Sequence, residues 1–251
     1  MMPTPPRNRF GFVLTLLCAA AMLFFTSIVP AQAFDKGPEL DKEKDYYALI
    51  ETTEGSATVK LYADKAPITV RNFVNLAEGT AESQDPKSGG VVKRPFYNDA
   101  PIFRVIPGQF IMTGRASETQ EGPGYTIPDE LDKDVTFSKP GILAMANKGP
   151  ETGGSQFFIT AKVMTSLNGK HAIFGEVLEH TDGLDVVTKI SELPRDAREK
   201  PVKPVKISKV TIFKLEKGLD AKAAAEKIPG TTYVSPTPAG EADKKQKQET
   251  K

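Results

Sequence analysis

Apolar and polar residues alternate along much of the chain, and this alternation predicts more strands than helices. Segments 47–53 and 57–62 alternate on either side of Glu54-Gly-Ser56, so we expect a hairpin there. The clearest alternation is near the end of the chain, at 205–214. Short apolar segments bounded by Gly and Pro predict further strands at 102–106, 110–113, 142–146, 156–160 and 173–177.

Only two segments place apolar residues at helical spacing. The first opens at Ala66-Pro67, where proline fits the first turn, and Gly79 ends it. The second follows Asp182, which we expect to cap it. The apolar positions are Val70, Phe73, Val74 and Ala77 in the first, and Leu184, Val187 and Ile190 in the second. Many short strands and two helices predict a mainly β fold, a closed antiparallel barrel.

The first 33 residues have the pattern of an export signal. Arg7 and Arg9 precede an apolar run from 10 to 29, and Ala31-Gln-Ala33 resembles a signal-peptidase site, so we predict cleavage after Ala33. The expected destination is the bacterial periplasm. Another secretory compartment, or a membrane anchor formed by the uncleaved run, is the alternative.

The remaining chain divides into three parts by composition. Residues 34–44 are polar and charged, which predicts a linker, and 45–216 contain the predicted strands and helices. Within that domain, 80–95 is polar and glycine-rich and predicts a surface insertion. Residues 217–251 are rich in Pro, Thr, Gly and Lys, which predicts a disordered charged tail, with a turn or two of helix at 221–227.

Charge and composition exclude several classes of function. The 33 basic and 32 acidic residues leave a net charge of +1, so no nucleic-acid partner is expected. Two His and one Cys do not suffice for a dense metal cluster, and we expect no metal or cofactor. We expect a monomer that meets the membrane only through an uncleaved signal segment.

Four motifs within 46–215 resemble those of the cyclophilin family of peptidyl-prolyl cis/trans isomerases. They are Phe103-Arg-Val-Ile-Pro-Gly108, Gly122-Pro-Gly-Tyr125, Met145-Ala-Asn147 with Gly154-Ser-Gln-Phe-Phe-Ile159, and Leu167-Asn-Gly-Lys-His-Ala-Ile-Phe-Gly175. The resemblance implies an eight-stranded barrel capped by two helices. It also implies that proline-containing polypeptides are the substrates and that the protein accelerates their folding.

The same resemblance implies the site residues. Arg104 matches the catalytic arginine, and Gln156 and Phe158 match the polar and aromatic residues of a second groove strand. The implied substrate-binding residues are Phe110, Ile111, Met112, Thr113, Ala146, Asn147, Leu167 and His171. His171 is expected to line the proline pocket without transferring a proton.

The chain departs from the family pattern on one strand. Phe103 stands where the family usually has His. Gln109 follows Pro-Gly where the family has Phe, so either one residue is inserted or Gln109 replaces that Phe. We favour the insertion, because glutamine would be poorly satisfied in an apolar pocket. The family's supporting glutamine is then replaced by Thr113, or by Met112 without the insertion.

These residue types suit amide rotation. Amide resonance opposes rotation by ~18–20 kcal/mol, and twisting the bond makes the prolyl nitrogen more basic. A fixed donor aimed at that nitrogen stabilises the twisted state more than the planar one. Arginine keeps its proton and can donate in two directions, which favours catalysis by Arg104. The alternative is a non-catalytic peptide-binding or holdase chaperone on the same fold.

Overall fold

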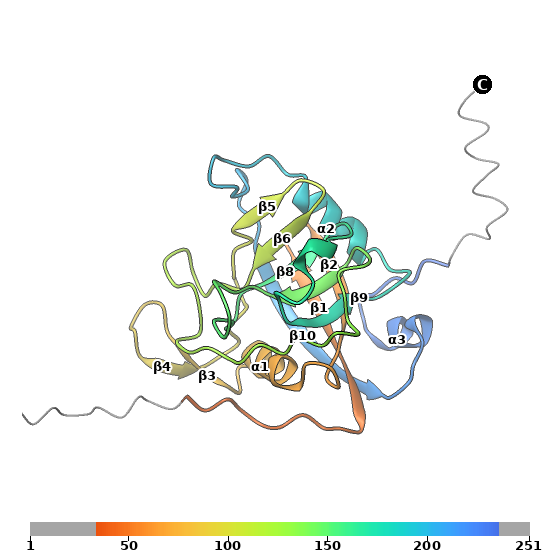
Figure 1. Ribbon diagram of the computed structural model, residues 1–251, viewed down its shortest axis with the longest axis horizontal. Helices are drawn as coiled ribbons and strands as arrows, with labels where there is room; N and C mark the ends of the chain where they lie inside the picture. Colours follow the sequence, from red (N-terminus) through yellow and green to blue (C-terminus); the bar gives the residue numbers. More distant parts are fainter. Residues whose placement is uncertain (1–33, 236–251) are drawn as a thin grey trace, which may run out of the picture. The chain divides into compact units, whose positions relative to one another are not determined.

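The computed structural model describes residues 34–235 (Figure 1). Eight strands form one antiparallel sheet in the order β10-β1-β2-β9-β7-β8-β6-β5. The strands are β1 (Lys44–Thr52), β2 (Gly55–Leu61), β5 (Arg104–Ile106), β6 (Phe110–Thr113), β7 (Ile142–Met145), β8 (Phe157–Thr160), β9 (Ile173–Val177) and β10 (Ile207–Glu216). All of the strand segments predicted from the sequence are therefore present, with ends that differ by a few residues.

The sheet is open between β5 and β10, which corrects the prediction of a closed barrel. These two strands are the edges of the sheet and do not pair with each other. The chain just before each of them comes together instead: Pro101 forms an isolated bridge with Lys206, and the Ile102 amide donates to the Val205 carbonyl at 2.9 Å. The result is a half-barrel whose edges meet outside the regular strands.

Helices α1 (Pro67–Glu78) and α2 (Gly183–Ser191) are those that the sequence predicts. Proline opens α1, and Gly79 ends it in the left-handed region at φ 74°. A Cβ at Gly79 would lie 2.5 Å from the Arg94 carbonyl carbon, so glycine is also required sterically. Asp182 occupies the N-cap position of α2, but its side chain makes no capping hydrogen bond there, contrary to prediction.

The main core lies between the sheet and these helices, and alternation along β1 shows how the sequence builds it. Tyr46, Ala48 and Ile50 face this core, together with Phe73 of α1 and Phe157 of β8. The intervening residues of β1 face the other way. Strand β1 is therefore buried on both faces.

The second face of β1 is covered by a segment that we predicted to be disordered. Residues 217–235 include helix α3 (Ala221–Lys227), which Asp220 caps by accepting from the Ala223 amide at 2.8 Å. Ala224, Ala225 and Ile228 are buried against Tyr47 and Leu49. The prediction of helix at 221–227 is confirmed, and the prediction of disorder is wrong for 217–235. The rest of that predicted tail and the predicted signal segment lie outside the described residues.

The predicted linker is also packed onto the domain. Its first part, residues 34–41, is here called the N-terminal strap. The buried amide of Asn75 on α1 donates to the strap carbonyls of Lys36 and Pro38, at 2.9 and 2.8 Å. The Phe34 ring lies 5.2 Å from the Tyr125 ring. A run of polar residues therefore did not indicate a free linker, because its backbone groups bond to side chains of the domain.

The insertion at 80–95 forms a small hairpin of its own. Strands β3 (Glu82–Gln84) and β4 (Val91–Lys93) pair antiparallel as a separate two-stranded sheet. The strap joins this hairpin as well, since the Glu82 amide donates to the Asp35 carbonyl at 2.7 Å. The sequence indicated a surface insertion there but not its strands.

Candidate functional site

The strand registers place the predicted catalytic arginine and phenylalanine in one row across the sheet. Arg104 lies opposite Met112, Met112 lies opposite Phe158, and Phe158 lies opposite Ala144. Residues directly opposite each other in an antiparallel sheet share a face. The row therefore brings Arg104, Met112 and Phe158 to one surface, on three adjacent strands.

Phe158 is the centre of an apolar cluster on that surface, here called the Phe158 cluster. Its ring stacks on Phe137 at 5.8 Å, meets His171 edge-on at 5.2 Å and lies 5.8 Å from Phe110. Phe158 is only 3% exposed, so it forms the floor of the cluster. The other buried members are Phe137, Ile142, Ala144 and Ile173, and the half-buried ones are Tyr62, Phe110, Met112, Val135, Ala146, Met164 and Leu167.

Arg104 lies at the edge of this cluster with its side chain 42% exposed. Its Cζ is 5.3 Å from the centre of the Phe110 ring, which is within range of a cation–π contact. Its Nε donates to Glu199 Oε2 at 2.6 Å. The other carboxylate oxygen of Glu199 accepts from Arg195 Nη1 at 3.3 Å. Arg104 is therefore tied at Nε, and its two Nη atoms donate to no residue in the described part of the chain.

Polar groups form another edge of the cluster, at the end of β7 and the start of β8. The Gln156 carbonyl accepts from the Ala146 amide at 2.9 Å, and the Gln156 side chain donates to the Glu121 carbonyl at 2.7 Å. The Asn147 side chain donates to the Lys170 carbonyl at 2.9 Å. These bonds fix the segment after β7 against the chain entering β8 and the loop before β9.

His171 is held in the same region by a contact of 3.1 Å between Nδ1 and the Met145 carbonyl. Burial lowers the pKa of His171 below its usual value, because the charged imidazolium is poorly solvated there. A neutral imidazole edge-on to Phe158 suits an apolar wall.

The structure brings together most of the predicted site residues and leaves out two. Ile111 is 3% exposed and faces the main core, between β5 and β8. Thr113 is 2% exposed and its Oγ1 donates to the Pro101 carbonyl at 2.9 Å. Alternation along β6 turns both side chains away from the face that carries Phe110 and Met112. Ile111 and Thr113 are therefore not placed to contact a ligand beside Arg104.

The structure also shows which side chain lies next to Arg104. Phe110 contacts the guanidinium of Arg104. Gln109 lies in the β5–β6 turn, where its backbone amide donates to the Ile106 carbonyl at 2.9 Å. Phe103, in place of the family's usual His, lies under the guanidinium of Arg115, with 3.8 Å from Cζ to the ring centre. On β6, Met112 is the residue directly opposite Arg104, so Met112 and not Thr113 faces the arginine.

Two residues of the site were not identified from the sequence. Glu199 is in a polar loop, 95 residues after Arg104, with no hydrophobic pattern around it. Phe137 lies in an irregular segment and is fully buried. No short motif marks either residue, although an isolated Phe in a polar segment is a weak signal of burial.

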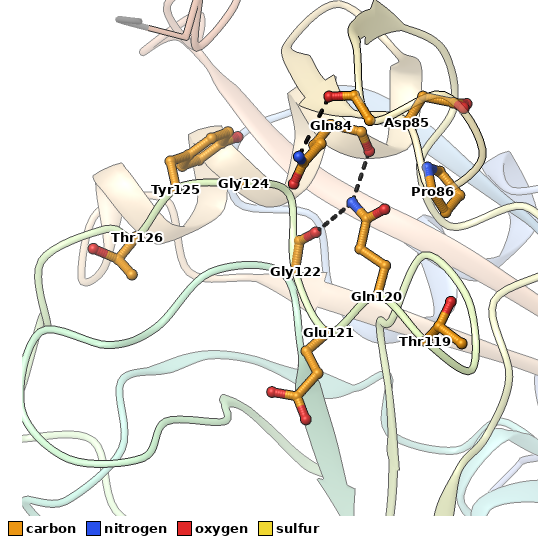
Figure 2. Close-up of a pocket in the computed structure, with 11 residues that line it drawn as sticks. Gln84, Asp85, Pro86, Thr119, Gln120, Glu121, Gly122, Gly124, Tyr125 and Thr126 are labelled. Atoms are coloured by element: carbon orange, nitrogen blue, oxygen red, sulfur yellow. Dashed lines mark hydrogen bonds between the residues drawn. The ribbon is translucent and has the colours of Figure 1, made fainter. Parts of the chain in front are cut away.

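A cavity of about 580 Å³ borders the site at Glu121 (Figure 2). It lies between the β3–β4 insertion and the loop 119–126, and Gln120 bridges its walls by donating to the Gln84 and Gly122 carbonyls at 2.7 and 2.9 Å. The Glu121 side chain pairs with Lys148, which lowers the pKa of that carboxyl. The insertion therefore extends the surface next to Gln156.

Within residues 34–235, His, Cys, Asp and Glu form no group of three or more suited to a metal ion. In the same range no helix is both long and apolar enough to cross a membrane. Fold and site together define a mainly antiparallel β domain that carries an apolar surface cluster with one arginine at its edge.

Known proteins are similar to this chain in sequence and in architecture. The family model described as cyclophilin type peptidyl-prolyl cis-trans isomerase matches residues 47–212. A probable peptidyl-prolyl cis-trans isomerase A of Mycobacterium leprae is 43% identical over 166 residues, 66% of this chain and 91% of that protein. A peptidyl-prolyl cis-trans isomerase B of Streptomyces anulatus is 40% identical over 168 residues, 66% of this chain and 95% of that protein.

A solved structure of a cyclophilin type peptidyl-prolyl cis-trans isomerase from Cryptosporidium parvum also matches. Its TM-score is 0.56 with 27% sequence identity, over 67% of this chain and 98% of that one. The chain therefore belongs to the family of cyclophilin-type peptidyl-prolyl cis-trans isomerases. The expected enzyme class is confirmed: this is a peptidyl-prolyl isomerase.

Proposed function

We propose that this isomerase acts on exported proteins and that the row from Arg104 to Phe158 is its active site. The Phe158 cluster holds the proline ring in an apolar surrounding. The Nη atoms of Arg104 donate to the prolyl nitrogen as the amide twists. The observation that carries this assignment is the single row of Arg104, Met112 and Phe158 across three strands.

The chemistry requires no covalent intermediate. Uncatalysed X-Pro bonds interconvert over about 10–100 s, and the barrier is amide resonance. A donor that binds the pyramidal nitrogen of the twisted amide lowers that barrier, because the nitrogen of the planar amide has its lone pair delocalised into the carbonyl and offers the donor none. Arg104 retains free Nη donors after its bond to Glu199, and arginine does not lose its proton at any pH of interest.

The substrate backbone is proposed to bind along the polar edge. The backbone of Ala146 and Asn147 and the side chain of Gln156 hold the peptide on either side of proline. Leu167 and His171 close the far side of the apolar cluster, in agreement with their positions beside Phe158. The substrates are proline-containing polypeptides, recognised by the ring and the extended backbone.

The export proposal depends on the amino-terminal sequence. Arg7 and Arg9, the apolar run 10–29 and Ala31-Gln-Ala33 support it, and those residues lie outside the described part of the chain. N-terminal sequencing of the protein from periplasmic extract tests it, with Phe34 expected as the first residue. Recovery of intact Met1 from the cytoplasmic fraction would contradict export.

Isomerisation of an X-Pro peptide, followed by a protease-coupled assay, tests the active site. Arg104→Ala is expected to lower kcat/KM about 100-fold or more, the usual cost of losing one donor to a transition state. Arg198→Ala is the matched control, because Arg198 is exposed in the loop 194–203 and belongs to no part of the proposed site. An Arg104→Ala enzyme with an unchanged rate would refute the role of Arg104. Peptide binding without isomerisation by the native protein would favour the holdase alternative.

A further inference from the structure

Glu199 bridges two arginines at the edge of the active site. Its Oε2 accepts from Arg104 Nε at 2.6 Å and its Oε1 accepts from Arg195 Nη1 at 3.3 Å. The carboxylate is 35% exposed, so water only partly screens it. One glutamate therefore connects the proposed catalytic arginine to a second cation that is itself fixed.

The loop that carries Glu199 is bonded to the strand that carries Arg104. The Val105 amide donates to the Glu199 carbonyl at 2.8 Å, and Arg195 Nη1 donates to the Val105 carbonyl at 3.0 Å. Arg195 and Pro201 form a bridge within the loop itself. Strand β5 is an edge strand of three residues, so this loop provides the pairing that its outer side would otherwise lack.

The backbone conformation of Glu199 indicates that its side chain has a function. Glu199 has φ 65°, in the left-handed region that glycine adopts without strain. Glycine would satisfy the turn, and the Val105 bond uses only the Glu199 backbone. A strained non-glycine residue is explained when its side chain does something that glycine cannot do.

Arg104 needs a partner of this kind. Its side chain is 42% exposed, and a free arginine side chain samples many rotamers. Met112, directly opposite, offers only a thioether, which is a weak acceptor. Among the described residues, Glu199 is the one that accepts a hydrogen bond from the Arg104 guanidinium.

We propose that Glu199 is a positioning residue: its carboxylate holds Arg104 at Nε, and this directs the Nη edge of the guanidinium toward the bound prolyl amide. Arg195 holds Glu199 in turn. The inference rests on the proposed role of Arg104 and adds the element that fixes its orientation.

Three substitutions at Glu199 separate positioning from a structural role. Glu199→Met has similar length with only a weak thioether acceptor and is expected to lower kcat about tenfold, with KM within about twofold, since the apolar cluster still binds proline. Glu199→Gln keeps an acceptor oxygen and is expected to retain kcat within about threefold. Glu199→Gly relieves the backbone, so it is expected to lower kcat as Met does while Tm stays within about 3 °C of the native value.

Glu216→Met is the matched control, because Glu216 pairs with Lys44 outside the site. The ¹⁵N–¹H resonance of Arg104 Nε gives an independent readout, and it is expected to shift in Glu199→Met and to shift less in Glu199→Gln. A native kcat in Glu199→Met and Glu199→Gly, with only Tm changed, would overturn the inference. If Glu199→Met does not fold, the kcat of Glu199→Gly and the Arg104 Nε resonance in Glu199→Gln decide whether Glu199 positions Arg104.

Failure of this inference is distinguishable from failure of the proposed active site. If Arg104→Ala is slow and Glu199→Met is fast, the site stands and Glu199 has no part in it. If Arg104→Ala is also fast, the role of Arg104 itself is wrong.

Discussion

Met112 lies directly between Arg104 and Phe158 in the β5–β6–β8 ladders, opposite both of them. Its neighbour Thr113 faces the opposite side of the sheet, where Oγ1 donates to the Pro101 carbonyl at 2.9 Å. Of the two positions that could replace the supporting glutamine of the family, the structure therefore puts only Met112 on the face that carries Arg104.

This arrangement predicts opposite results for two glutamine substitutions. Met112→Gln is expected to fold normally and to keep or raise kcat/KM, by up to about threefold, because a half-buried amide beside Arg104 finds partners. Thr113→Gln is expected to destabilise the protein by about 2–4 kcal/mol, since it overpacks a buried position and breaks a hydrogen bond. Urea unfolding and the isomerase assay measure both. Equal stabilities of the two variants would contradict the assigned faces of β6.

Phe158 is expected to contribute to both stability and substrate binding. Because it is 3% exposed and contacts Phe110, Phe137 and His171, Phe158→Ala should cost about 3–5 kcal/mol. Phe158→Leu should cost less, about 1.5 kcal/mol, and should mainly raise KM. Phe213→Ala is the control, since Phe213 packs in the separate α3 cluster. A Phe158→Leu enzyme with native KM would exclude the cluster as the proline site.

The stability of the protein should depend on the protonation of His171. Burial depresses the folded-state pKa of His171 below the value of about 6.5 expected in the unfolded chain. The unfolded state therefore binds more protons between those two pKa values, so the free energy of unfolding falls as pH drops below about 6.5 and the contribution is fully present above it. His171→Gln should flatten the dependence of Tm on pH between pH 5 and 7.

The isomerase rate should be independent of pH above 7, because no proton is transferred in the proposed reaction. A rate that rises with pH above 7 would contradict this.

The segment 217–235 should be part of the folded domain. A chain that ends at Lys217 loses α3 and uncovers Tyr47 and Leu49, and burial of Ile228 alone is worth about 1.5–3 kcal/mol. This truncation should lower Tm by several degrees and increase binding of a hydrophobic dye. A chain that ends at Ser235 keeps the described contacts and serves as the control. Identical Tm values for the two chains would show that α3 adds no stability.

The strands and the centre of the site could be predicted because their signals are local. Alternation marks β1 and β10, and the motif around Arg104 identifies the family from adjacent residues. The same local pattern could have excluded Ile111 and Thr113, since strict alternation allows only two of four consecutive strand residues on one face.

Other features depend on contacts between distant segments. Glu199 reaches Arg104 from 95 residues away, and no spacing rule connects a polar loop to an edge strand. The strap and α3 were predicted as linker and tail from polar composition. The strap is held in place by Asn75, and α3 is held by the second face of β1. Both partners are distant in the sequence from the segments that they hold.

The pairing of β1 with β10 also sets the order in which the chain can fold. Residues 44–52 pair with residues 207–216, and α3 then covers the outer face of β1. Contacts between such distant segments form late, because a long loop must close before they stabilise the fold. During synthesis, β1 can pair with the adjacent β2 early, but its other edge and its outer face stay uncovered until residues 207–235 are available.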